Sequence, residues 1–87
     1  MKIELKPIGR RSGGTVSWDP ETGEIWGPQS EEVRELIERA VRRGGVVTHP
    51  YPTFYEVDDP WHNVRDFALV VSQFWKVPAI LREEVAV

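Results

Sequence analysis

The chain is 87 residues long, contains no cysteine and carries a formal net charge of −3. This length supports one hydrophobic core, so we expect a single domain over residues 1–87. The missing cysteines exclude disulfides, thiolate metal sites and a nucleophilic thiol, and the acidic balance argues against a general nucleic-acid coat. No stretch reaches the ~18 apolar residues of a membrane span and no signal-peptide core is present, so we expect a cytoplasmic protein without a membrane partner.

The first part of the chain predicts three short strands. Ile3 and Leu5 alternate with charged residues, which favours a half-buried strand over residues 2–8. Two β-prone runs, 15–18 and 24–26, flank the sequence Asp-Pro-Glu-Thr-Gly, which is typical of a tight turn and predicts a β-hairpin. Alternation along the second run separates Ile25 from Trp26, so we expect Trp26 to lie away from the core.

A helix is predicted after this hairpin. Ser30 is suited to the N-cap, two glutamates follow it, and Gly44 is suited to the terminator after a pair of arginines. The apolar residues between these signals recur at helical spacing and form one stripe: Val33, Leu36, Ile37, Ala40 and Val41.

The second half predicts further strands and a second helix. Residues 46–48 and 53–57 have β character on either side of a His-Pro-Tyr-Pro sequence. Asp59 and Pro60 favour a helix start, with apolar residues at helical spacing up to position 75, although residues 69–71 also fit a buried strand. Residues 79–87 fit either a helical turn or a strand. The order predicts an α+β fold: a small, mostly antiparallel sheet containing a β-hairpin, with two helices packed on one face.

No enzyme signature is present. The chain lacks a phosphate-binding glycine motif, a nucleophile elbow and a zinc-binding histidine motif, so we expect no catalytic residue, no metal and no cofactor. The only histidines are His49 and His62. His62 and Asp66 have i,i+4 spacing, which would allow an acid–base pair or, with Asp58 or Asp59, a metal site. A solvated polar face is the more common meaning of such spacing, so this site is a minor alternative.

Two pairs of arginines favour nucleic-acid binding as a second alternative. Arg10 and Arg11 stand beside two glycines, and Arg42 and Arg43 end the first predicted helix. Together they would form a phosphate-binding patch if the fold brings them close, and Trp18 or Trp26 would stack on a base. The net negative charge and the helix dipole, which already accounts for the second pair, weigh against this alternative.

The leading hypothesis is based on the aromatic residues. The chain has four tryptophans, two tyrosines and three phenylalanines, which is more than a core this small needs. We expect Trp61, Phe67 and Phe74 to fill the core. Trp26, Tyr51 and Tyr55 lie on a short strand or beside prolines, where exposure is expected. They predict a non-catalytic interaction domain that uses exposed aromatic residues and a sheet edge to bind a protein partner or a second copy of itself.

Overall fold

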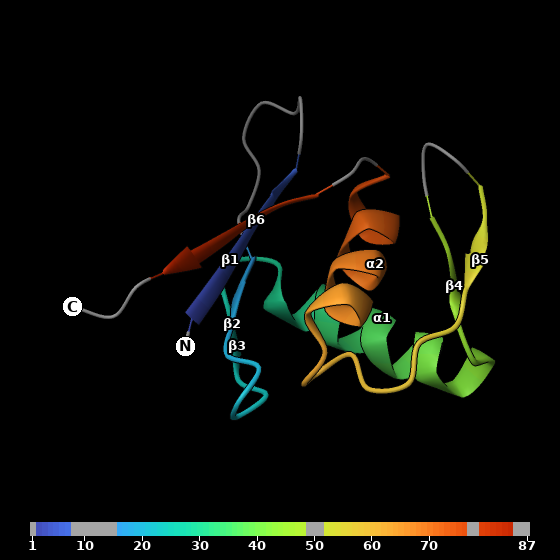
Figure 1. Ribbon diagram of the computed structural model, residues 1–87, viewed down its shortest axis with the longest axis horizontal. Helices are drawn as coiled ribbons and strands as arrows, with labels where there is room; N and C mark the ends of the chain where they lie inside the picture. The colour runs from blue at the N-terminus through green and yellow to red at the C-terminus, as the bar shows by residue number, and fades with distance from the viewer. Residues whose placement is uncertain (1, 8–15, 49–51, 77–78, 85–87) are drawn as a thin grey trace.

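The computed structural model describes residues 2–7, 16–48, 52–76 and 79–84, and these ranges form an α+β fold (Figure 1). The elements in chain order are β1 (Lys2–Pro7), β2 (Val16–Trp18), β3 (Ile25–Trp26), α1 (Ser30–Arg43), β4 (Val46–Val47), β5 (Phe54–Tyr55), α2 (Val64–Trp75) and β6 (Ala79–Glu84). Every described strand pair is antiparallel. The predicted fold class is therefore confirmed.

The main sheet has the strand order β3-β2-β1-β6. The predicted hairpin is present as β2 and β3, and its turn is closed by Gly23, which adopts φ 77° and donates its N–H to the carbonyl of Asp19 at 2.7 Å. β6 pairs with the whole length of β1, from Lys2↔Glu84 to Pro7↔Ala79. Of the two structures predicted for residues 79–87, a helical turn or a strand, Ala79–Glu84 therefore form the strand.

β4 and β5 form a separate two-stranded sheet, with the pairs Val46↔Tyr55 and Val47↔Phe54. Both helices lie on the same side of the main sheet, and the β4–β5 ribbon lies beyond the helices on the side away from that sheet (Figure 1). The strands on either side of the His-Pro-Tyr-Pro sequence are thus present as predicted, but they do not join the main sheet. The helices stand between the two sheets.

α1 begins and ends close to the predicted positions. Its N-cap is Gln29, which makes no side-chain capping bond, so the expected cap at Ser30 is wrong by one residue. Its C-cap is Gly44, as predicted, with φ 80°. The N–H groups of Gly44 and Gly45 bond to the carbonyls of Val41 and Ala40, at 3.2 and 3.0 Å, and so satisfy the free carbonyl groups of the last turn.

α2 begins at Val64, later than the predicted start at Pro60. Its N-cap is Asn63, whose side-chain oxygen accepts a hydrogen bond from the N–H of Asp66 at 3.1 Å. Residues 60–62 form a turn instead, in which the N–H of His62 bonds to the carbonyl of Asp59 at 3.3 Å. The short run 69–71 is helical, so the strand alternative for it is wrong. Among the described residues, no helix is long and apolar enough to cross a membrane.

The core lies between the main sheet and the helices. At its centre the rings of Trp18 and Phe67 stack, with centroids 4.0 Å apart and an interplanar angle of 2°, and both side chains are fully buried. The indole N–H of Trp18 donates to the carbonyl of Trp61 at 2.8 Å. Phe67 therefore fills the core as expected. Trp61 and Phe74 are only half-buried and pack against its margin.

Candidate functional site

The three aromatic residues predicted to form one binding surface do not gather in the described structure. Trp26 is 37% exposed on β3, as expected, and the ammonium of Lys2 lies 4.9 Å from the centre of its ring. Tyr55 is half-buried on β5 and packs against the core, with the guanidinium of Arg65 5.9 Å from its ring centre. β3 and β5 lie on opposite sides of the helices (Figure 1). Tyr51 is outside the described residues.

Only half of the predicted arginine patch falls within the described residues. Arg42 and Arg43 are exposed on the last turn of α1, whereas Arg10 and Arg11 are outside the described ranges. Of the two tryptophans expected to stack on bases, Trp18 is fully buried and is therefore excluded. Trp26 retains an exposed ring.

His62 and Asp66 do not form the predicted pair. His62 lies in the turn before α2, so the two residues are not one helical turn apart on the same helix face. The imidazole Nδ1 instead lies 2.6 Å from the carbonyl oxygen of Pro20, which ties this turn to the β2–β3 hairpin. His49 is outside the described residues. Across the described ranges, no three His, Asp or Glu side chains are placed to hold a metal ion.

Asp66 has a structural role that its sequence position does not reveal. Its side chain is almost fully buried, although it was expected on the polar face of α2. One carboxylate oxygen accepts hydrogen bonds from the backbone N–H groups of Asp58, at 2.9 Å, and Asp59, at 3.4 Å. The other oxygen accepts from the guanidinium of Arg65 at 3.1 Å. The carboxylate therefore anchors the segment that leads into α2.

The β4–β5 ribbon exposes apolar side chains on one face. Val47 and Phe54 are cross-strand partners, so their side chains project to the same face, and they are 41% and 56% exposed. Val46 is buried on the other face. A Cβ built at Gly45 would lie 2.4 Å from the Phe54 ring, so the ring covers this glycine closely. We call Gly45, Val47 and Phe54 the outer ribbon face.

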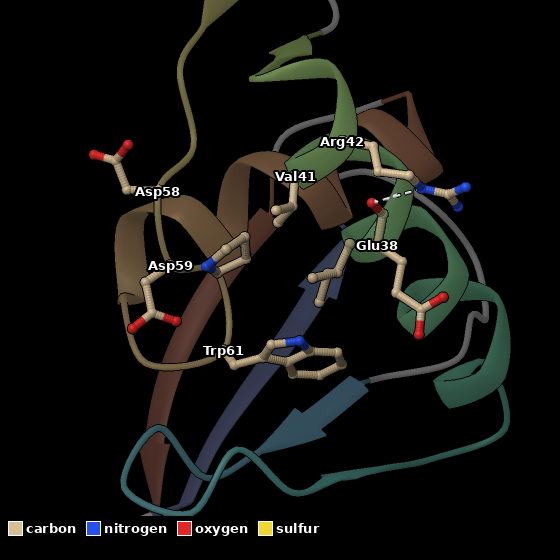
Figure 2. Close-up of a pocket in the computed structure, with 8 residues that line it drawn as sticks. Glu38, Val41, Arg42, Asp58, Asp59 and Trp61 are labelled. Atoms are coloured by element: carbon tan, nitrogen blue, oxygen red, sulfur yellow. Dashed lines mark hydrogen bonds between the residues drawn. The ribbon is translucent and has the colours of Figure 1, made fainter.

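A groove of about 580 Å³ lies between α1 and the segment 58–61. Its lining residues are Ile37, Glu38, Val41, Arg42, Asp58, Asp59, Pro60 and Trp61. Ile37 and Pro60 are fully buried beneath it, whereas Val41 is 47% exposed and Trp61 is half-buried. In Figure 2, Asp58 and Asp59 lie on one side of the groove, Glu38 and Arg42 lie on the other, and Val41 and Trp61 lie between them.

The groove and the outer ribbon face belong to the same two chain segments. The first segment, residues 38–47, begins in one wall of the groove and ends in β4. The second segment, residues 54–61, begins in β5 and ends in the opposite wall. The two segments run antiparallel and are joined by the β4–β5 pairs. The apolar residues exposed along them are Val41, Val47, Phe54 and, in part, Trp61. Exposed apolar side chains on two paired segments are a feature of many binding surfaces.

The sequence contained a partial signal for these residues. Phe54 and Tyr55 are adjacent in a predicted strand, so alternation requires one of the two rings to face outward. The prediction chose Tyr55, and the structure turns Phe54 outward instead. Val41 was assigned to the buried stripe of α1, but it lies beyond the edge of that stripe.

Comparison of the chain with protein-family models, with curated proteins and with solved structures finds no match in any of the three.

Proposed function

We propose that this chain is a non-catalytic interaction domain that binds a segment of another protein along the groove and the outer ribbon face. The observation that carries the proposal is the exposure of apolar side chains on these two segments: the cross-strand pair of Val47 and Phe54 on the ribbon, and Val41 and Trp61 in the groove. Apolar and aromatic side chains at the centre of a contact, surrounded by charged residues, are the usual composition of a protein interface.

A peptide segment suits this surface better than a second copy of the chain. The groove has α1 on one side and the segment 58–61 on the other, and a groove between two chain segments can accept an extended or helical peptide. Its rim carries three carboxylates and one guanidinium, from Glu38, Asp58, Asp59 and Arg42. A twofold contact through the groove would bring two copies of this net-negative rim into one interface, and the repulsion between like net charges disfavours that arrangement.

The test is a selection from a random peptide display library against the whole chain, followed by affinity measurements on the selected peptides. Phe54→Ser and Val41→Ser are expected to weaken binding by about tenfold or more, because each removes an apolar contact from the proposed surface. Trp26→Ser is the matched control, since it removes an exposed aromatic ring on the far side of the helices. It should change the affinity less than twofold.

Two results would overturn this proposal. One is a selection in which no peptide is enriched on the wild-type chain. The other is a set of selected peptides whose affinity is unaffected by both Phe54→Ser and Val41→Ser. Circular dichroism of each variant separates lost contacts from lost folding, and both replaced side chains are exposed enough that the folded state should persist.

A second candidate function is binding of single-stranded nucleic acid at Trp26. Trp26 and Lys2 are both exposed on the face of the main sheet opposite its buried side, and no described helix covers that face (Figure 1). A hollow of about 290 Å³ beside Trp26 is also lined by Arg34. An exposed ring with a lysine over it, and an arginine lining the neighbouring hollow, matches the stacking and phosphate contacts that single strands require.

The two candidates are separated by a titration with a short single-stranded oligonucleotide at low ionic strength. The second candidate predicts saturable shifts of the Lys2 and Trp26 amide resonances, and predicts that the affinity falls steeply as salt is added. Unmoved resonances at low salt would exclude it, because electrostatic attraction is strongest there.

A further inference from the structure

The rim of the groove carries an excess of negative charge among the described residues. Glu38, Asp58 and Asp59 are exposed, and no described cation forms an ion pair with any of the three carboxylates. Among the described lining residues the guanidinium belongs to Arg42, whose Nε donates to the backbone carbonyl of Glu38 at 3.4 Å. That contact places the positive charge of Arg42 at the C-terminal end of α1, where it offsets the helix dipole.

The aromatic wall of the groove already carries a cation of the chain itself. The guanidinium of Arg34 lies 5.6 Å from the centre of the Trp61 ring. Tryptophan has the strongest attraction for cations among the aromatic side chains, because the face of its ring carries negative charge density. Arg34 already occupies this position at Trp61, so the ring offers a partner an apolar contact, and a partner's cations are left to the carboxylates of the rim.

The acidic side of the groove is held in place before any partner arrives. Asp66 accepts hydrogen bonds from the N–H groups of Asp58 and Asp59, so the backbone of this side is anchored to α2. Their carboxylates point outward from the rim, away from the Trp61 ring (Figure 2). An anchored backbone reduces the conformational entropy that is lost when a charged partner binds.

From these observations we infer that the partner segment is basic. It inserts an apolar side chain between Val41 and Trp61, and lysine or arginine residues on both sides of that side chain face Asp58 and Asp59 on one rim and Glu38 on the other. This inference rests on the proposed function, since it names the chemistry of the partner that binds the same groove. Complementary charge at a rim sets the choice of partner and the rate of association.

The test compares the sequences selected from one random peptide library by three forms of the full chain. The wild type should enrich peptides with an apolar residue flanked by lysine or arginine. Asp58→Asn/Asp59→Asn should bind those peptides about tenfold more weakly. Glu32→Gln/Glu35→Gln is the matched control, because it removes the same charge from exposed positions of α1 that do not line the groove. It should bind them within about twofold of the wild type.

A charge-reversed variant gives a second readout. Asp58→Lys/Asp59→Lys should enrich acidic flanking residues in place of basic ones, since it inverts one rim of the groove. Enrichment of neutral or acidic peptides by the wild type would overturn the inference and leave the proposed function intact. Equal loss of peptide affinity in Asp58→Asn/Asp59→Asn and in Glu32→Gln/Glu35→Gln would also overturn it, because the affinity would then depend on the net charge of the chain and not on the rim. Failure to enrich any peptide would instead remove the proposed function itself.

Discussion

Replacing Asp66 tests how the acidic side of the groove is built. The side chain is 2% exposed, and its carboxylate accepts hydrogen bonds from the N–H groups of Asp58 and Asp59. Asp66→Ala removes this acceptor, and no other described group accepts a hydrogen bond from those two N–H groups. We expect the free energy of unfolding to fall and the segment 58–59 to become mobile, which would loosen one rim of the groove.

The size of the effect follows from the three contacts. The bond from Asp58 is short at 2.9 Å, and its loss costs about 1–3 kcal/mol. The bond from Asp59 is long at 3.4 Å and adds less. The ion pair with Arg65 adds about 1 kcal/mol at most, since the Arg65 side chain is 63% exposed. Water will hydrate the freed N–H groups in part, so we expect the free energy of unfolding to fall by about 2 kcal/mol in total. This loss corresponds to a fall in melting temperature of about 10 °C.

The assay is urea unfolding followed by tryptophan fluorescence, together with hydrogen exchange at the amide of Asp58. Arg65→Ala is the control, because it removes the ion pair and leaves both backbone bonds in place. It should cost less than about 1 kcal/mol and leave the Asp58 amide protected. A cost below about 0.5 kcal/mol for Asp66→Ala, or equal costs for the two variants, would refute the view that the backbone bonds anchor this segment.

Two further predictions concern the packing that positions the site. Gly45→Ala should destabilise the fold by about 1–3 kcal/mol, because the new Cβ would lie 2.3 Å from the carbonyl oxygen of Tyr55. Gly44→Ala has open space around it and should cost only about 1 kcal/mol, because alanine disfavours the positive φ of this position. Thermal melts should therefore show the larger loss of stability for Gly45→Ala. Trp18→Phe should lower the free energy of unfolding by about 2–3 kcal/mol in urea titrations, since it loses ring volume from the stack on Phe67 and the hydrogen bond to the carbonyl of Trp61.

The fold class could be predicted because its signals are local. The turn sequence between β2 and β3, the apolar stripe of α1 and the glycine that ends it are each contained in a few neighbouring residues. The start of α2 was misplaced because Asp59–Pro60 and Asn63 both resemble helix caps. The contacts of Asp66 favour the start at Asn63. Its carboxylate accepts hydrogen bonds from the backbone of residues 58 and 59, and its own N–H donates to the side chain of Asn63.

The candidate site was less predictable, because it depends on how distant segments are placed. Exposure of Trp26 followed from alternation within one strand, and it is confirmed. The groove joins α1 to a segment about twenty residues later in the chain, so no local pattern indicates it. The separation of β4 and β5 from the main sheet has the same origin, since the interposed helices are a tertiary feature.

The most direct test of the proposed binding surface is a map of amide chemical shifts as the strongest peptide from the library selection is titrated into the labelled chain. The account predicts that the largest shifts fall on residues 38–42, on Phe54 and on residues 58–61, and that the side-chain indole N–H of Trp61 shifts with them. Shifts centred instead on Lys2 and Trp26, or scattered without a focus, would contradict the claim that the groove and the outer ribbon face are where this protein binds its partner.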